Sequence, residues 1–246
     1  MKTLILGKGE VGSALKIVLD NYHEVYIRDI DPLDLKDAEI MHVCFPYSDK
    51  FVEYVKSYKE EYKPRLTIIN SSIEVGTTEQ CGDHVVYSPI RGRHRPSLAA
   101  ELKIFPKWIA GYNDEDTKLA NDYFSEARWD CQITGDVKGM ELCKLVSNVH
   151  MGLEVAWAQE MERLFKKMGG SMDTYKRWET GYQLGYARLQ QFQLGRPIMK
   201  SDPIGGHCIL ECTEILQKQF YSLAFEFIKT SNDIKKGEVN AEVSRG

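Results

Sequence analysis

The stretch Lys2-Thr3-Leu4-Ile5-Leu6-Gly7-Lys8-Gly9-Glu10-Val11-Gly12 decides the fold of this chain. Its apolar first half predicts a short buried strand over residues 2–6. The glycines Gly7, Gly9 and Gly12 follow, and residues 11–20 then have helical spacing. A strand that enters a glycine turn and continues as a helix is typical of a phosphate-binding site, because free N–H groups at a helix N-terminus attract anions.

An acidic residue stands where a dinucleotide-binding unit needs one. Residues 24–28 read as a second strand, and Asp29 closes it, 20 residues after Gly9. An acid at this spacing binds the hydroxyls of the adenosine ribose and repels a 2′-phosphate, which favours NAD over NADP. The neighbouring Arg28 leaves NADP open. The alternative is a tight turn followed by a coincidental acid.

Further strands are predicted over residues 39–45, 66–70, 85–87 and 108–110, with a helix over residues 49–62 that stops before Pro64. Dinucleotide-binding folds usually have a helix between the second and third strands, and the stretch between Asp29 and residue 39 is too short to contain one. Alternating strands and helices predict an α/β fold with a Rossmann-like, doubly wound parallel sheet. Ligands bind beyond the carboxyl ends of such strands. We therefore expect the cofactor NAD to contact Gly7, Gly9, Glu10, Val11, Gly12, Asp29, Phe45, Pro46, Ser71 and Ser72.

The second half of the chain is helical in pattern. From about residue 137 apolar side chains recur at helical intervals up to Gly169-Gly170, which predicts a helix about 45 Å long that forms an interdomain spine or a dimer seam. Further helices are predicted over residues 172–194 and 209–229. We expect an NAD-binding domain over residues 1–136, an all-helical dimerisation and substrate domain over 137–230, and a polar tail over 231–246 that frays.

Composition narrows the class of protein. The net charge of −4, from 32 basic and 36 acidic residues, provides no positive field for nucleic acid or an anionic membrane. No apolar run approaches the roughly 18–20 residues that span a bilayer. The six cysteines show no Cys-x-x-Cys pair, and no export signal precedes the glycine turn. We expect a cytoplasmic homodimer with reduced, mostly buried cysteines, which acts on a small molecule.

Two patterns in the helical half suggest chemistry. Lys144 and Asn148 are four residues apart, so they share one helix face and can polarise a substrate oxygen; the alternative is a solvated Glu141–Lys144 pair. Cys208 follows Gly205, Gly206 and His207 at the start of a predicted helix, where the helix dipole stabilises a thiolate. A buried structural cysteine is the competing interpretation. The spacing of His207, Cys208 and Cys212 fits no metal template.

A basic loop lies on the expected rim of the sheet. Arg91, Arg93, His94 and Arg95 follow Ser88-Pro89 and suit a phosphate or a carboxylate of the substrate. The alternatives are a solvated loop and an ion pair across a subunit boundary. Together with Gly205, Gly206 and His207, the residues Arg91, Arg93 and His94 are the predicted substrate contacts.

These motifs together resemble the UDP-glucose/GDP-mannose dehydrogenase family. The resemblance is carried by Gly7 to Gly12 with Asp29, the stretch Ser71-Ser72-Ile73-Glu74-Val75-Gly76-Thr77-Thr78, Tyr87-Ser88-Pro89, Lys144 with Asn148 and Gln159-Glu160, and Gly205-Gly206-His207-Cys208. The motifs follow the family's order over nearly the whole chain. The Lys144–Asn148 pair is also similar to that of the β-hydroxyacid dehydrogenases.

The resemblance implies that NAD oxidises a sugar alcohol twice to a carboxylate. It implies that Cys208 is the nucleophile, that Lys144 and Asn148 steady an oxyanion, and that Ser72 contacts the cofactor or a water. Three departures accompany it: Ile90 and His94 stand where the family has acids, Cys212 replaces an aspartate, and a third domain is missing. Glu141, Glu211 or a histidine then takes over the acid–base work, or the reaction stops after two electrons.

Three functions follow as hypotheses. The first is an NAD-dependent oxidation of an anionic sugar or sugar nucleotide through Cys208. The second is a two-electron dehydrogenase or reductase in which Lys144 is the acid–base group and Cys208 is structural. The third is a non-catalytic NAD-binding protein.

Overall fold

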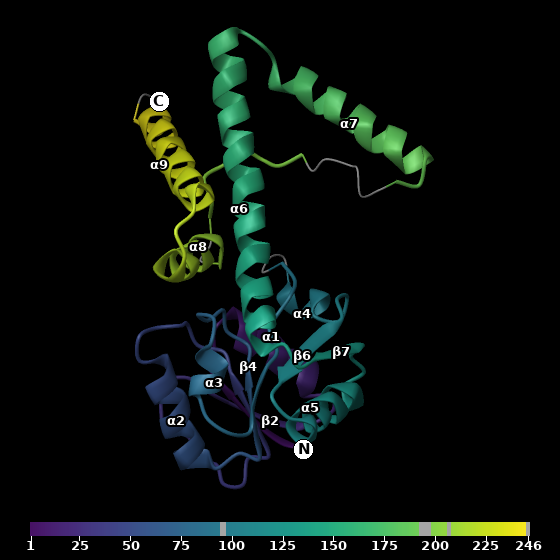
Figure 1. The fold of residues 1–246 in the computed structure, drawn as a ribbon, viewed down its shortest axis with the longest axis vertical. Coiled ribbons are helices and arrows are strands. Elements are labelled where there is room, and N and C mark those ends of the chain that lie inside the picture. The colour runs from purple at the N-terminus through teal and green to yellow at the C-terminus, as the bar shows by residue number, and fades with distance from the viewer. Residues whose placement is uncertain (94–96, 192–197, 206–207, 245–246) are drawn as a thin grey trace. The chain divides into compact units, whose positions relative to one another are not determined.

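The computed structural model describes residues 1–93, 97–191, 198–205 and 208–244 (Figure 1). The chain divides into two compact units, Met1–Lys144 and Leu145–Gly246. The division falls inside helix α6 (Val137–Met168), whereas we expected a domain boundary at the start of this helix.

The first unit is built on a seven-stranded sheet. Its strands are β1 (Lys2–Leu6), β2 (Glu24–Arg28), β3 (Ile40–Val43), β4 (Leu66–Ile69), β5 (Val85–Tyr87), β6 (Lys107–Gly111) and β7 (Cys131–Thr134). They lie in the order β2-β1-β3-β4-β5-β6-β7. The order reverses beside β1, which places a topological switch point at the carboxyl ends of β1 and β3. The Rossmann-like fold that the sequence predicts is confirmed.

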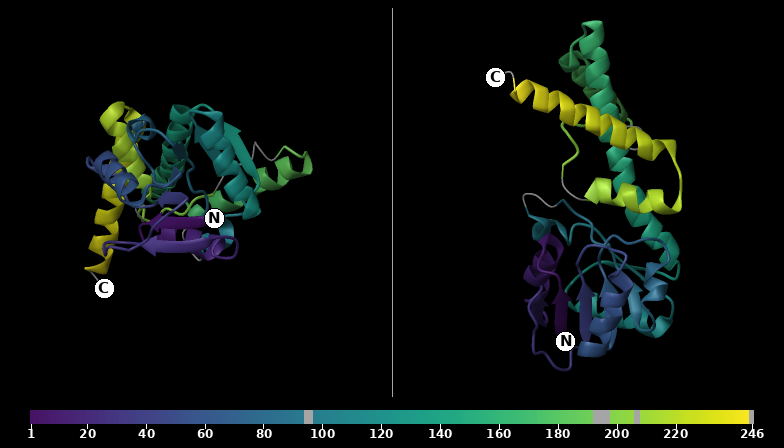
Figure 2. Two further views of the ribbon diagram at one scale, coloured as in Figure 1. Left: turned by 90° about the horizontal axis from the view of Figure 1, so that it is seen from below. Right: turned by 90° about the vertical axis from the view of Figure 1, so that its left-hand side faces the viewer.

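Helices of the first unit pack on both faces of the sheet (Figure 2). They are α1 (Glu10–Leu19), α2 (Phe51–Tyr62), α3 (Thr77–Gln80), α4 (Leu98–Glu101) and α5 (Asp114–Glu126). Alternate strand residues feed two cores, because successive side chains of a strand point to opposite faces. Ile5 and Ile68 lie in the core beneath α1 and α5, whereas Val43 and Ile69 lie in the core beneath α2.

The connection from β2 to β3 contains no helix, as the short spacing in the sequence predicts. One pairing differs from the expected parallel sheet, since β5 and β6 run antiparallel. A parallel neighbour needs a crossover back to the other end of the sheet. Among the described residues between β5 and β6, the structure has the four-residue helix α4 and no longer element, and β6 enters from the end at which β5 leaves. Helix α5 and strand β7 occupy residues to which the sequence assigned no element.

The second unit contains most of α6 together with α7 (Met172–Arg188), α8 (Cys208–Gln219) and α9 (Leu223–Val243). Helix α6 ends at the predicted glycines: Gly169 has φ +71°, and the N–H of Gly170 donates to the carbonyl of Phe165 at 2.8 Å. Within the described ranges, every helix is too short or too polar to cross a bilayer.

Two expectations for the last third of the chain are wrong. The single helix over residues 209–229 is two helices, because Ser222 caps α9 by accepting the N–H of Ala224 at 3.2 Å. The polar tail from Ser231 does not fray, since α9 continues to Val243. Ser231 and Asn232 are buried, and Asn232 accepts the N–H of Ile204 at 2.7 Å. At these two positions the polar side chains are buried and hydrogen-bonded within the second unit.

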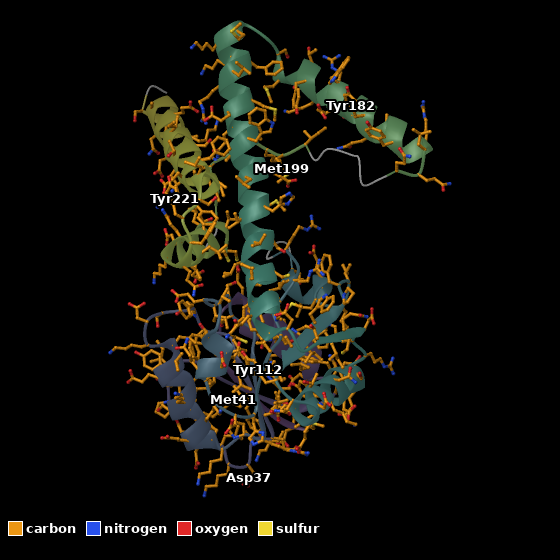
Figure 3. All side chains as sticks on the ribbon, viewed as in Figure 1. Asp37, Met41, Tyr112, Tyr182, Met199 and Tyr221 are labelled. Atoms are coloured by element: carbon orange, nitrogen blue, oxygen red, sulfur yellow. The ribbon has the colours of Figure 1, made fainter. Side chains whose placement is uncertain are left out.

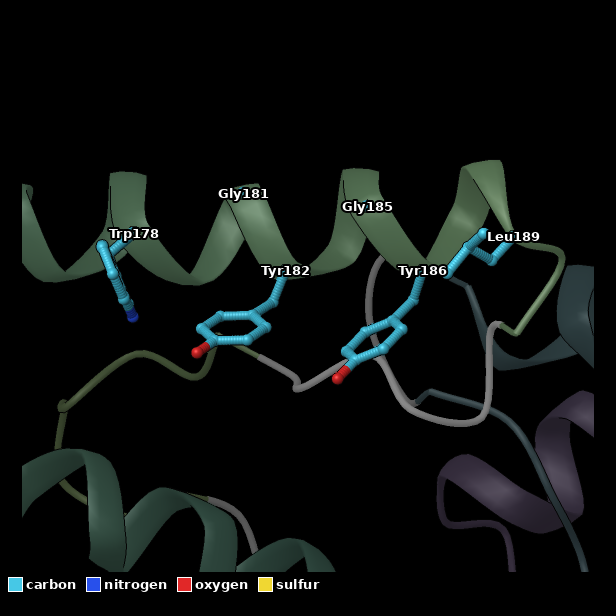
Figure 4. A pocket seen from close by; sticks show the side chains of 6 residues that line it. All are labelled: Trp178, Gly181, Tyr182, Gly185, Tyr186 and Leu189. Atoms are coloured by element: carbon cyan, nitrogen blue, oxygen red, sulfur yellow. The ribbon is translucent and has the colours of Figure 1, made fainter.

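Helix α7 has an exposed aromatic face (Figure 4). Trp178, Tyr182 and Tyr186 lie one turn apart beside Gly181, and their rings follow one another at centroid distances of 5.9 and 6.2 Å. Tyr182 is also labelled among all the side chains in Figure 3. Among the described residues, the lining of the hollow along this face consists of Trp178, Gly181, Tyr182, Gly185, Tyr186 and Leu189, none of which is a predicted catalytic residue.

Candidate functional site

The three glycines of the first turn have three different surroundings. Gly7 adopts φ +100°, and a Cβ there would lie 3.0 Å from the carbonyl carbon of Cys44. A Cβ on Gly12 would lie 1.9 Å from the carbonyl oxygen of Gly7, so helix α1 packs directly on the turn. A Cβ on Gly9, in contrast, would meet no atom within 4 Å. Two glycines are therefore required by the protein's own packing, and the third leaves open space beside the backbone.

The start of α1 faces this open space. Gly9 is the N-cap residue and provides no side-chain cap, so the first N–H groups of the helix have no cap from this position. The Asp29 carboxylate accepts the N–H of Lys8 at 3.1 Å and is exposed. An anion-binding helix start and a carboxylate thus lie on the two sides of one turn, as a dinucleotide requires for its pyrophosphate and its ribose.

Four of the predicted cofactor contacts follow the carboxyl ends of β3 and β4: Phe45, Pro46, Ser71 and Ser72. The Ser71 hydroxyl donates to the carbonyl of Phe45 at 2.6 Å, which ties the ends of the two strands together. Phe45 is half-buried against Phe51, whereas Pro46 is exposed. Ser72 is half-buried and follows Ser71. The structure places these four predicted cofactor contacts at the edge where the strand order reverses.

Glu141 has a structural role that the sequence did not predict. Its carboxylate is fully buried and accepts the N–H of Gly76 at 2.6 Å, the N–H of Thr78 at 2.8 Å and the Thr78 hydroxyl at 2.6 Å. Three donors satisfy a buried carboxylate. Glu141 therefore anchors the first turns of α6 to the start of α3. Both of its carboxylate oxygens already accept hydrogen bonds from the protein.

Two lysines converge on the main chain that follows β5. Lys144 is half-buried, and its Nζ donates to the carbonyl of Ile90 at 3.0 Å. Lys107 is 4% exposed, and its Nζ donates to the carbonyls of Ser88 at 2.9 Å and Pro89 at 3.3 Å. Burial lowers the pKa of Lys107 to about 7, because a low dielectric disfavours the ammonium. The predicted catalytic lysine thus shares one three-residue segment with a second, buried amine.

A network of buried polar side chains links Ser88 to Tyr123 on the face of the sheet that α5 covers. The Asn70 amide donates to the carbonyl of Ser88 at 2.6 Å, and its oxygen lies 2.8 Å from Nδ1 of His42. Nε2 of His42 lies 3.0 Å from the Tyr123 hydroxyl. Burial lowers the pKa of His42 to about 3, so this imidazole is neutral at physiological pH.

In the second unit, Asn148 and the start of α8 come together. The Asn148 amide donates to Sγ of Cys212 at 3.1 Å. Cys208 is the first residue of α8 and is half-buried; it lies one turn before Cys212 and therefore on the same helix face. None of the six cysteines forms a disulfide. The sequence did not predict the contact between Asn148 and Cys212, because the two residues are 64 positions apart.

The predicted substrate contacts are only partly within the described residues. Arg93 is paired with Glu101 at 2.7 Å, an ion pair within the chain rather than across a subunit boundary. Arg91 is exposed, and its guanidinium stacks over Phe105 at 5.1 Å. Gly205 is exposed. His94, Arg95, Gly206 and His207 lie outside the described residues.

Comparison with known proteins identifies relatives. No protein-family model matches the sequence. The chain is similar to the UDP-N-acetyl-D-mannosamine dehydrogenase of Methanocaldococcus jannaschii, with 26% identity over 172 residues. That match covers 66% of this chain and 37% of the relative, so the chain spans well under half of the relative's length.

Solved structures share the fold. The UDP-D-ManNAc dehydrogenase of Pyrococcus horikoshii superposes with a TM-score of 0.73 and 17% identity, over 96% of this chain and 68% of that one. The UDP-N-acetyl-mannosamine dehydrogenase Cap5O of Staphylococcus aureus gives 0.76 and 13%, over 100% and 70%. The 3-hydroxyisobutyrate dehydrogenase of Mycobacterium tuberculosis gives 0.66 and 16%, over 98% and 94%. The sequence relative and these folds confirm the resemblance that the motifs indicated.

Proposed function

We propose that this relative of the nucleotide-sugar dehydrogenases is an NAD-dependent oxidoreductase that oxidises an alcohol of an anionic sugar or sugar nucleotide. The observation that carries the cofactor assignment is the open space at Gly9, between two glycines that the fold itself requires. A pyrophosphate at the start of α1 and a ribose at Asp29 fit this turn. NAD, when bound, accepts hydride from the substrate carbon.

The predicted catalytic residues would act on the substrate oxygen and carbon. The Lys144 ammonium and the Asn148 amide stabilise negative charge on the oxygen as the C–H bond breaks. The Cys208 thiolate then adds to the aldehyde carbon and forms a C–S bond, which gives a thiohemiacetal. This thiohemiacetal would lose its hydride to a second NAD, which would give a thioester. Water adds to this thioester, the C–S bond breaks, and the carboxylate product leaves with the thiol restored.

A specific observation favours a second candidate. The Asn148 amide donates to Cys212, which stands where the resemblance expects an aspartate, and Glu141 is engaged with Gly76 and Thr78. The expected aspartate is therefore replaced, and the Glu141 carboxylate is already occupied by hydrogen bonds. A two-electron dehydrogenase needs only Lys144 at the substrate oxygen, and Cys208 is then structural.

Counting NADH per substrate separates the two candidates. The assay uses limiting UDP-N-acetylmannosamine, other UDP-sugars and 3-hydroxy acids, each with excess NAD. Two NADH per substrate support the first candidate, and one supports the second. Under the first candidate, Cys208→Ala abolishes acid formation and keeps NAD binding, while Cys143→Ala, at an exposed position on α6, keeps both. NAD binding without turnover on any of these compounds would contradict both candidates.

We also propose that the protein is a homodimer. The long helix α6, which spans 32 residues, exposes large apolar side chains that include Val146, Trp157 and Leu164. Exposed apolar stripes on a helix are typical of association surfaces. Light scattering of the purified chain tests this, and a monomeric mass at micromolar concentration would contradict it.

A further inference from the structure

An arginine at the end of β2 is bound by side chains of α2. Arg28 directly precedes Asp29, and its side chain is 10% exposed. Its guanidinium donates to the Glu61 carboxylate at 2.6 Å and to the Tyr62 hydroxyl. Its Cζ lies 5.0 Å from the ring centre of Tyr58 and 5.4 Å from that of Tyr62. One carboxylate, one hydroxyl and two aromatic rings from α2 therefore surround this cation.

These contacts stabilise the positive charge of the Arg28 guanidinium in its position against α2. Burial disfavours the charged guanidinium, but the hydrogen bonds that it donates to Glu61 and Tyr62 outweigh burial and raise the pKa of Arg28 above its ordinary value. Aromatic faces attract a guanidinium, and a carboxylate partner supplies a charge-assisted hydrogen bond. The Tyr62 hydroxyl is itself fixed, because it donates to the carbonyl of Leu33 at 3.0 Å.

The neighbouring Asp29, in contrast to Arg28, is exposed and lies beside the glycine turn. Its carboxylate is exposed and is oriented toward the glycine turn by the N–H of Lys8. In dinucleotide-binding folds an acid at this point binds ribose hydroxyls, whereas a nearby arginine accommodates a 2′-phosphate. This chain has both residues side by side, and Glu61 engages the arginine.

We propose that Glu61 is a specificity-determining residue, which excludes NADP by holding Arg28 away from the 2′-position of the bound cofactor. The inference rests on the proposed function, since it presumes that the glycine turn binds a nicotinamide dinucleotide. Glu61 does not touch the cofactor; it acts through Arg28. Without the Glu61 carboxylate, the guanidinium is freed to pair with a 2′-phosphate, while the contacts of Asp29 to the ribose of NAD are kept.

The test compares the binding of NADH and NADPH by cofactor fluorescence with the full chain. Glu61→Ala should tighten NADPH binding by about tenfold, the effect of one charge-assisted contact, and leave NADH binding within about twofold. Glu60→Ala is the matched control, since Glu60 is an exposed acid on the same helix and should change neither affinity. Adding Arg28→Leu to Glu61→Ala should abolish the gain for NADPH.

Each result decides between the proposals. Wild-type binding of NADH, with an unchanged preference in Glu61→Ala, overturns this inference alone. The same holds for an equal gain in Glu60→Ala, or for a gain that survives Arg28→Leu, because the effect would then be one of general charge. Failure of the wild type to bind either cofactor removes the proposed function and this inference together.

Discussion

Replacing the buried Lys107 by methionine should change how stability depends on pH. The pKa of this lysine falls from an ordinary 10.5 to about 7 in the folded protein, because burial disfavours its charge. Between these two values the unfolded chain binds more protons than the folded one, so this group makes the folded state more stable as pH rises. Below about pH 7 both states carry the charge, and the folded state bears the full cost of burying it.

The magnitude follows from the shift. Each pH unit within this window changes the contribution of Lys107 by about 1.4 kcal/mol, so two units change it by about 3 kcal/mol. Loss of the hydrogen bonds to Ser88 and Pro89 costs Lys107→Met about 1–3 kcal/mol, a cost that offsets part of the gain and is nearly independent of pH. Relative to the wild type, Lys107→Met should therefore be most stable at low pH and lose that advantage as pH rises.

The assay is urea unfolding of both proteins at about pH 7.5 and about pH 9.5, inside the window that the pKa shift defines. The other titrating groups are common to both proteins and cancel in the difference between the two free energies of unfolding. Lys118→Met, at an exposed lysine of α5, is the control and should show a constant difference. A constant difference for Lys107→Met would refute the reasoning, because Lys107 would then not be buried with a lowered pKa.

Two further substitutions test the packing at the site. Gly12→Ala should lower the free energy of unfolding by about 1–3 kcal/mol, because its Cβ would lie 1.9 Å from the Gly7 carbonyl oxygen; an unchanged melting temperature would contradict this contact. Glu141→Gln should cost about 2–3 kcal/mol, since one amide oxygen cannot replace a carboxylate that accepts from Gly76 and Thr78; a loss of turnover with unchanged stability would instead give Glu141 a catalytic role.

The sequence predicted the parts of the fold that local patterns determine. The strand, glycine turn, helix and acid of residues 2–29 are encoded by residues close in the chain, so their arrangement could be predicted. The antiparallel pairing of β5 and β6 depends on the path of the chain between them, which periodicity does not reveal. Helix α9 continues beyond Ser231 because its polar side chains are bonded inside the second unit, and polarity alone indicated a frayed tail.

In the candidate site, too, local sequence patterns did not reveal which residues contact one another. Glu141 was a possible acid–base residue by its position one turn before Lys144, but its partner Thr78 is 63 residues away. The sequence pattern did not show that Arg93, a predicted substrate contact, pairs with Glu101. The sequence analysis did not predict the burial of Lys107, because lysine side chains are rarely buried. For Glu141 and Lys107 the missing information was a partner distant in the chain, whereas Arg93 and Glu101 are only eight residues apart.

Titration of NAD into the wild type and Gly9→Val tests the central claim most directly. A valine side chain fits the folded protein, because its Cβ would meet no atom within 4 Å, and Gly9 has an extended backbone with φ −68° that valine adopts. It would, however, fill the space through which a pyrophosphate approaches the start of α1. We predict saturable NAD binding by the wild type; in Gly9→Val we predict a free energy of unfolding lowered by no more than about 1 kcal/mol, the cost of a poorer N-cap, and NAD binding weakened by at least about tenfold, or about 1.4 kcal/mol. Equal NAD binding by the two proteins would contradict the account, because the glycine turn would then not be the cofactor site.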